Sequence, residues 1–476
     1  MPYLRSILHV YVLVFQNYHN YTASGIKVKQ EILHGLGDLY YQAKSMFYDD
    51  MYLQLLMILQ LAIRQCMSCT DSTDNDFECV SPVQRTILEI LPVLCPTERL
   101  STMWFHLLQG LLCFLPGYDG NMDVVNSETT TVISGRFLQE EHSESVEDER
   151  IRFSSYLFGE KLLPILVNIY LHAPAREKCV LSPDIIKGLG RCLVTRRDSP
   201  NSMLWRIAVE GFNHVLIDDI TKLIKDSDID PNKRKSVRIR FWKEIADVYE
   251  IFLVNSCGRA LSSDVSSESL KSDEILEMTI LDVLGDKLLK AELDAPIDSV
   301  HRLIVTLDRC ASRTGSLSIE TVGLLPPHCS RFSLCCLQKI ISLCRYNTEE
   351  DWHKTRLEIC KISMPILMNR CECIINQFIS DEKDLGEYPF PSARLEEMVF
   401  LLQQLSSLII HSETTCMLHL QQKFKDSLLK NQSKEGRSHL LLLLPSFCDL
   451  ILSRSLRIRE LVHVLLKLIT EELGLQ

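Results

Sequence analysis

The chain has few glycines, few prolines and no long apolar run. Its 18 glycines and 17 prolines are too few for a β-sandwich or a β-propeller, because the many tight turns of those folds depend on both residue types. Outside the N-terminal segment, the longest apolar run lies at 440–452 and is interrupted by Pro445 and Asp449. A membrane-spanning helix requires about 18 uninterrupted apolar residues. The sequence therefore predicts neither a turn-rich β fold nor a transmembrane helix.

Positive charge is also scarce. The chain carries 51 Lys and Arg residues against 62 Asp and Glu residues, which gives a net charge of −11. Nucleic-acid binding depends on many Lys and Arg contacts to phosphate groups, so this balance excludes a general affinity for nucleic acid. Apolar residues make up 46% of the chain and charged residues 24%, as in ordinary globular proteins. The composition favours a soluble, acidic, mostly helical protein.

The N-terminal segment, residues 1–16, has the outline of a signal peptide because Arg5 precedes an apolar run. However, His9 and several aromatic residues interrupt the run, and no cleavage site of the Ala-x-Ala type follows soon after it. We therefore interpret the segment as an amphipathic or buried helix. It also lacks a polar cap, which predicts that a helical array continues on its N-terminal side.

The eighteen cysteines bear on the cellular compartment. Most of them lie in apolar helical stretches, as Cys113 and Cys310 do. A chain of this length buries a hydrophobic core without disulfides, and a buried free cysteine behaves as a small apolar residue. The cysteines therefore indicate a cytosolic protein with free thiols rather than a secreted protein with a disulfide framework.

Apolar residues recur at helical spacing from one end of the chain to the other, whereas strand-like alternation is scarce. Val300, Leu303, Ile304 and Leu307, for example, follow the pattern of one buried helix face. Short breaks between such segments bring neighbouring helices back antiparallel. The pattern predicts an all-α fold, a superhelical array of antiparallel helix hairpins of the ARM/HEAT solenoid type. A non-repeating all-helical domain is the alternative, because no sharp repeat consensus is present.

Polar and acidic stretches divide the predicted array into blocks. Charged, Ser-rich and Pro-containing segments interrupt the apolar periodicity at several points. The predicted organisation is a helical block over 1–116, an acidic disordered loop over 117–150, a helical block over 151–260, a Ser-rich loop over 261–272, a helical block over 273–380, a linker over 381–391 and a C-terminal helical block over 392–476.

The sequence contains no motif of a glycine-rich phosphate-binding loop, of a zinc metalloprotease or of a hydrolase nucleophile. Asp226, Asp228 and Asp230 have the spacing that opens a calcium-binding loop. Pro231 and Val237 stand where that loop requires Gly and Glu, so we reject a calcium site there.

Two arrangements that contain cysteine are candidates for a metal site or a catalytic pair. Cys66 and Cys69, followed by Cys79, have thiolate spacing that suits zinc, but no fourth ligand lies at a usual distance. His328 and Cys329 could form a base and a nucleophile, but adjacency in sequence does not provide the required geometry. We therefore predict no catalytic residue, no metal site and no cofactor, and we predict that the protein is not an enzyme.

One basic segment, residues 232–240, stands out from the acidic background. Its cations are candidates for contact with an anionic lipid headgroup or an acidic partner. The favoured interpretation is a solvated loop and first helical turn, balanced by the acidic residues at 226–230. Trp242 and Tyr249, just beyond the segment, are expected in the core. The candidate residues are Lys233, Arg234, Lys235, Arg238 and Arg240.

Several segments of the chain are distinctive in sequence. They are RFWKEIADVYEIFLV at 240–254, LGDK at 284–287, DAPID at 294–298, LDRCASRT at 307–314, HCSRFS at 328–333, KQEILHGLG at 29–37 and PVQRTILEILP at 82–92. Together they resemble the C-terminal region of the Mon-two (monensin-sensitivity) family, and its plant members in particular. The resemblance covers nearly the whole chain except the acidic stretch 117–150.

The resemblance implies a large HEAT/armadillo-type scaffold, related to the large Arf guanine-nucleotide exchange factors but without their catalytic exchange domain. It implies a peripheral location on the cytosolic face of Golgi (trans-Golgi network) and endosomal membranes. The implied partners are Dopey-type scaffold proteins, Arf-like GTPases and phospholipid flippases. Family members are much longer than 476 residues, so this chain would be the C-terminal part only. A homo-oligomer of the full-length protein is left open.

We therefore predict a non-catalytic scaffold in endosome-to-Golgi and vacuolar vesicle and protein trafficking, which acts by protein–protein binding. The alternative is a regulator of an Arf or Arf-like GTPase cycle that has no exchange domain of its own. A nucleotide-exchange assay separates the two, because a pure scaffold leaves the exchange rate unchanged.

Overall fold

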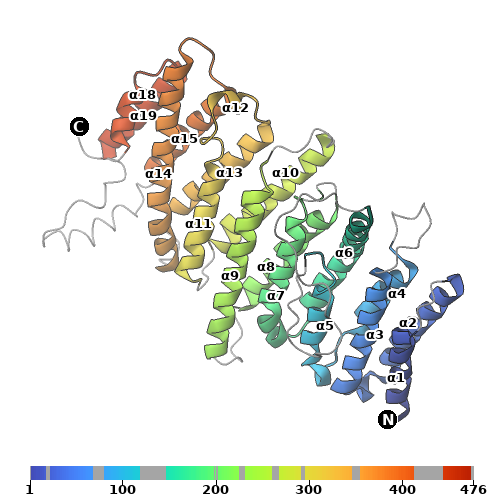
Figure 1. The fold of residues 1–476 in the computed structure, drawn as a ribbon. Helices are drawn as coiled ribbons and strands as arrows, with labels where there is room; N and C mark the ends of the chain where they lie inside the picture. Colours follow the sequence, from blue (N-terminus) through green and yellow to red (C-terminus); the bar gives the residue numbers. More distant parts are fainter. Residues whose placement is uncertain are drawn as a thin grey trace, which may run out of the picture. The chain divides into compact units, whose positions relative to one another are not determined.

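The computed structural model contains 17 α-helices and no strand among the residues that it describes (Figure 1). Helices pack on their near neighbours in sequence, so the predicted all-α class and its sequential packing are confirmed. The described residues are 2–17, 22–67, 80–117, 146–197, 199, 202–223, 231–259, 267–290, 295–345, 354–411 and 443–472.

The chain groups into two compact units, Met1–Val237 and Arg238–Gln476, whose boundary falls inside helix α9. In the first unit, α1 packs on α3, α2 on α4, and α6 and α7 on α8. Short 3₁₀ segments follow α2 and α4. The helices of this unit are α1 (Pro2–Asn17), α2 (Ala23–Ala43), α3 (Asp49–Met67), α4 (Pro82–Ile90), α5 (Met103–Leu112), α6 (Val146–His172), α7 (Ala175–Val194) and α8 (Leu204–Leu223).

In the second unit, α11 packs on α13, α13 on α14 and α15, and α15 on α19. A π-helical turn, Val283–Leu288, extends α10. The helices are α9 (Pro231–Asn255), α10 (Ser267–Asp282), α11 (Ile297–Ala311), α12 (Ile319–Gly323), α13 (Pro327–Cys344), α14 (Lys354–Leu385), α15 (Ser392–His411), α18 (Leu444–Leu450) and α19 (Leu456–Glu472).

The apolar faces that the sequence predicts are the buried faces of the helices. Val300, Leu303, Ile304 and Leu307 are all buried on α11. The N-terminal segment is the amphipathic helix α1, which buries one face against α3. Local sequence also sets where helices begin. Ahead of α4, the Ser81 hydroxyl accepts a hydrogen bond from the Gln84 backbone N–H at 3.2 Å, which forms half of a capping box.

Three helix ends differ from the predicted block boundaries. Helix α6 begins at Val146, inside the stretch predicted as an acidic loop, and α10 begins at Ser267, inside the predicted Ser-rich loop. Acidic and Ser residues are favourable in a first helical turn, because they hydrogen-bond and complement the N-terminal dipole. Helix α14 extends to Leu385, into the predicted linker 381–391. Residues 118–145 lie outside the described residues.

None of the described helices is long and apolar enough to cross a membrane.

Candidate functional site

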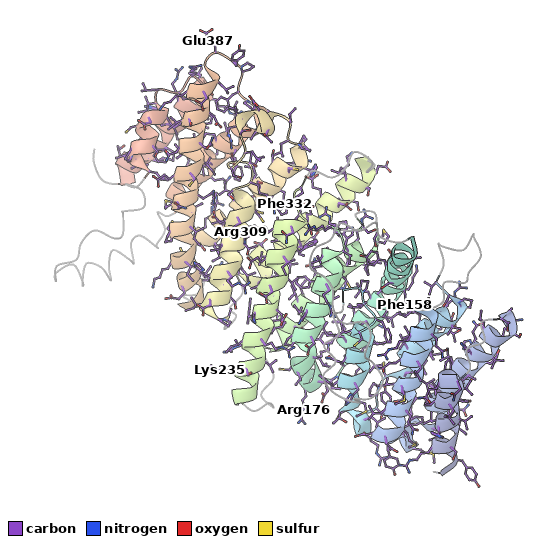
Figure 2. All side chains as sticks on the ribbon, viewed as in Figure 1. Phe158, Arg176, Lys235, Arg309, Phe332 and Glu387 are labelled. Atoms are coloured by element: carbon purple, nitrogen blue, oxygen red, sulfur yellow. The ribbon has the colours of Figure 1, made fainter. Side chains whose placement is uncertain are left out.

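The predicted basic segment lies at the N-terminal end of α9 (Figure 2). The side chains of Lys235 and Arg240 are exposed and that of Arg238 is half-buried. Lys235 and Arg238 are three residues apart and share a helix face, whereas Arg240 projects from a different side. The side chains of Lys233 and Arg234 lie outside the described residues. The segment therefore does not bring its described cations together on one surface.

The core predictions around this segment are confirmed. Trp242 and Tyr249 are both buried, so neither is a stacking platform on the surface. Elsewhere, on α14, Cys371 is buried and Cys373 is exposed, because residues two positions apart on a helix project to nearly opposite sides.

The metal candidates of the sequence analysis fall on residues that the structure does not describe. These are the three aspartates at 226–230 and the cysteines at 66, 69 and 79, of which only the backbone of Cys66 is described. Within the described part of the chain, no three His, Cys, Asp or Glu side chains come together as metal ligands would.

The His328 and Cys329 side chains are close, but their environment opposes nucleophilic chemistry. Cys329 Sγ lies 3.4 Å from Nε2 of His328, and that same nitrogen lies 3.0 Å from the carbonyl oxygen of Arg259. The imidazole therefore bonds a backbone carbonyl through the atom that would have to accept the thiol proton. Burial raises the pKa of Cys329 to about 11, and only 3% of the residue is exposed. A protonated, buried thiol is a poor nucleophile.

Two of the distinctive sequence segments, 307–314 and 328–333, meet at the C-terminal end of α9. Arg313 donates hydrogen bonds to the carbonyl oxygens of Leu253, Val254 and Cys257, the Val254 bond measuring 2.8 Å. Leu253 and Val254 lie in the last turn of α9, where carbonyl groups have no N–H of a following turn to bond, and Cys257 lies just beyond the helix end. The guanidinium of Arg313 also lies 5.5 Å from the centre of the Phe332 ring.

Neighbouring contacts connect further helices to the C-terminal end of α9. Ser333 on α13 donates to the carbonyl oxygen of Cys310 on α11 at 3.1 Å, and Arg331 pairs with Glu274 on α10 at 2.6 Å. The backbone N–H of Gly258 donates to Glu277 on α10 at 3.1 Å. The two distinctive segments thus connect α9, α10, α11 and α13. Their residues act in packing and helix capping.

A pocket of about 670 Å³ opens in the second unit, where α14 ends and α15 begins. Figure 2 places Glu387 in the loop between these helices. The volume lies within the range of about 300–1,000 Å³ that is usual for ligand sites. Residues of α14, the loop 386–391, α15 and the link between α18 and α19 form its walls. The lining residues are Phe378, Glu382, Leu385, Gly386, Glu387, Tyr388, Phe390, Leu395, Arg454 and Ser455.

Both apolar and charged side chains line the pocket. Phe378 and Phe390 stack with ring centres 4.7 Å apart and planes at 28°. Tyr388 is 78% exposed. Glu382 accepts hydrogen bonds from the Ser453 hydroxyl at 3.0 Å and from the Arg454 backbone N–H at 2.8 Å, which anchors the start of α19.

The anchoring role of Glu382 has a counterpart in the first unit. Glu160 on α6 accepts from the Ser202 hydroxyl at 3.0 Å and from the Met203 backbone N–H at 2.9 Å, just ahead of α8. In both units a carboxylate of one helix therefore fixes where a later helix begins. This recurrence identifies Glu382 chiefly as an anchor within its unit, whereas Glu387 makes no ion pair within the described residues.

A buried ion cluster adjoins the pocket, since Asp381 and Arg394 stand next in sequence to the lining residues Glu382 and Leu395. Arg394 on α15 donates to Asp381 on α14 at 2.7 Å and contacts Glu397 at 3.3 Å, and all three side chains are almost fully buried. Arg394 also donates to the carbonyl oxygens of Thr314 and Leu317 at 2.8 and 3.0 Å. Burial raises the pKa of Glu397 to about 7, although Arg394 opposes the shift. The cluster fixes the two helices that carry the pocket walls.

Sequence reasoning missed this pocket because residues 381–391 were interpreted as a linker. A signal was present: Tyr388 and Phe390 alternate with Pro389 and Pro391 directly after a charged run. Prolines restrict the backbone, so aromatic side chains between them are held in place rather than in a mobile tail.

Comparison with known proteins shows the family of the chain. The family described as the C-terminal region of Mon2 protein matches residues 112–428. Curated relatives include a MON2 homolog of Xenopus laevis (22% identical), the monensin-resistant homolog 2 of Caenorhabditis elegans (25%) and a human MON2 homolog (21%). Each alignment covers 53% of this chain and only 14–15% of the relative's length.

Among solved structures, a circular tandem repeat protein with novel repeat topology and enhanced subunit contact surfaces is similar over 99% of this chain and 94% of its own, at 11% identity and a TM-score of 0.32.

Proposed function

The chain belongs to the family of the Mon2 C-terminal region, and from that premise we propose that it is a non-catalytic scaffold which serves membrane trafficking by binding other proteins. Family membership is the observation that carries the proposal. The contacts of the distinctive segments support it, because Arg313 and Phe332 cap and pack helices. The pocket at the end of α14 supplies a concave surface that a protein partner can enter.

The proposal extends to place and partners. The scaffold acts on the cytosolic face of Golgi and endosomal membranes, in endosome-to-Golgi and vacuolar transport. Its partners are a Dopey-type scaffold protein, an Arf-like GTPase and a phospholipid flippase, as the family resemblance implies. The relatives are several times longer than the region they share with this chain, so any of these partners could contact parts of the protein outside it.

Affinity purification from cells tests the proposal. The 476-residue chain and the longest natural product of its gene are tagged and compared. We expect a Dopey-type protein to be recovered with both, which would place partner binding in this helical region. Recovery with the longer product alone would remove partner binding from this region, and recovery with neither would contradict the proposal.

The same preparations separate the scaffold from the alternative, a regulator of an Arf-like GTPase cycle. Nucleotide exchange on the purified GTPase is measured with and without the longer product. A scaffold leaves the exchange rate unchanged, whereas a regulator changes it.

A further inference from the structure

The pocket suits an apolar side chain. Phe390, Leu385 and Leu395 line it with partly exposed apolar side chains, and Phe390 stacks on the fully buried ring of Phe378. Tyr388 stands almost fully exposed at the edge, where its ring can cover an inserted group. Exposed aromatic residues beside a cavity are typical anchor points of protein recognition, because they bury much area with few rotatable bonds.

The rim of the pocket is more acidic than basic. Two carboxylates, Glu382 and Glu387, line it against one guanidinium, that of Arg454. Some carboxylates of the second unit pair with cations of neighbouring helices, as Asp308 does with Arg370 at 2.7 Å. Neither Glu382 nor Glu387 forms an ion pair among the residues that the structure describes. The carboxylate of Glu387 is exposed, so it is open to a cation that a partner carries.

Arg454 indicates a further property of the partner, a group that accepts hydrogen bonds. A guanidinium has five N–H donors and no acceptor, so at the rim it is suited to carbonyl oxygens. A peptide offers such oxygens along its backbone, next to an apolar side chain and a cation. The pocket volume of about 670 Å³ suits a short segment and not a broad protein face.

We propose that this pocket binds a short segment of another protein that carries an aromatic or branched apolar side chain next to Lys or Arg. The apolar side chain packs beside Tyr388, Phe390 and Leu395, and the cation pairs with Glu387. The inference rests on the proposed protein-binding function and names the chemistry of one partner segment.

The pocket is held in shape before a partner arrives. The Arg394–Asp381 pair fixes α15 against α14, and Glu382 fixes the residues that precede α19. Pro389 and Pro391 limit the backbone between the two aromatic residues of the loop. A pre-shaped site loses little conformational entropy on binding, so a short segment can bind with useful affinity.

A peptide library displayed on phage and selected on the immobilised full chain tests the proposal. Enriched peptides are then synthesised with a fluorophore and titrated by anisotropy against the wild type and two pocket variants, Tyr388→Ala and Glu387→Lys. Two control variants change exposed residues of the same types that do not line the pocket, Tyr48→Ala in the first unit and Glu268→Lys on α10. Circular dichroism and melting temperature establish that every variant is folded.

The expected result is enrichment of peptides with an apolar anchor next to Lys or Arg. Tyr388→Ala should weaken their binding by about tenfold or more, as loss of an anchor residue does. Glu387→Lys should weaken it at low salt, with a smaller loss at high salt, because salt screens exposed charges. The control variants should bind like the wild type.

Three outcomes would overturn the inference: no enrichment, enrichment of acidic peptides, or binding that survives both pocket substitutions. The proposed scaffold function is judged separately by affinity purification. If the Dopey-type protein is recovered with Tyr388→Ala and Glu387→Lys as well as with the wild type, scaffold binding stands and this pocket is not its site.

Discussion

Gly258 and Phe332 are in direct contact just past the C-terminal end of α9. A Cβ atom placed on Gly258 would lie 2.3 Å from Cδ1 of the Phe332 ring. Gly258 also has a φ of +60°, a left-handed conformation that residues with a Cβ rarely adopt. Glycine is therefore required there for two separate reasons, backbone conformation and space.

Gly258→Ala is predicted to destabilise the second unit strongly. The left-handed backbone should cost about 1–2 kcal/mol, and forcing the ring aside should add about 1–3 kcal/mol. Gly386→Ala is the matched control, since Gly386 has a similar φ of +56° and no atom within 4 Å of the added Cβ. Urea unfolding measures both. Equal losses for the two variants would show that the Phe332 contact contributes nothing.

Arg313 is predicted to contribute more to stability than its exposed neighbour Arg259, although both donate to the carbonyl oxygen of Val254. Arg313 alone also reaches Leu253 and Cys257. Lysine cannot reproduce this forked geometry, so Arg313→Lys should cost about 2 kcal/mol. Arg259→Lys should cost less than about 1 kcal/mol. Thermal unfolding of the two variants makes the comparison, and a reversed order would contradict the capping role of Arg313.

Glu397 is predicted to make the stability of the second unit depend on pH. Burial raises its pKa from 4.5 to about 7 against the opposing effect of Arg394 and Arg370. The folded protein therefore binds a proton more tightly than the unfolded chain, and the free energy of unfolding should fall as the pH rises from about 4.5 to about 7. The contribution is on the order of 3 kcal/mol.

Urea titrations at several pH values test this, with Glu397→Gln expected to reduce the slope and the exposed neighbour variant Glu396→Gln expected to keep it. Asp219 in the first unit, whose pKa burial also raises to about 7, contributes in the same direction and remains in both variants. An unchanged slope in Glu397→Gln would mean that Glu397 does not titrate in this window.

Cys329 is predicted to react slowly with alkylating reagents. Its thiol is buried and its pKa is raised to about 11, so little thiolate is available at neutral pH. Cys373 and Cys448 are exposed and should be modified first. Timed iodoacetamide labelling with mass spectrometry measures the order. Rapid labelling of Cys329 in the folded chain would instead support a nucleophile beside His328.

The basic segment of α9 is predicted to be ordinary solvated surface. The double substitution Lys235→Gln and Arg240→Gln removes its two exposed described cations. A control with the same net charge, Arg176→Gln with Lys187→Gln, changes exposed cations on α7. Both should bind phosphatidylserine vesicles equally. If the α9 variant bound more weakly than the control at low salt, and this difference disappeared at high salt, the segment would be assigned a lipid contact.

The sequence predicted buried residues correctly where apolar residues recur at the spacing of a helix. The helical spacing on α11 located its buried face, and the apolar setting of Trp242 and Tyr249 placed them in the core. Helix boundaries were predicted less well where a charged residue pairs with a residue of another helix. Asp381 belongs to a charged run that is typical of a linker, but it lies in a helix and is buried because Arg394 pairs with it. No local pattern identifies that partner.

The sequence by itself determined that this protein is helical and which family it resembles, because period and motif are properties of neighbouring residues along the chain. It could not show what the distinctive segments do. Only the tertiary structure brought Arg313 to the end of α9 and Phe332 onto Gly258. The pocket likewise depends on α14, α15 and the link before α19 meeting in space. Such contacts join residues tens of positions apart, and packing alone decides which of those residues meet.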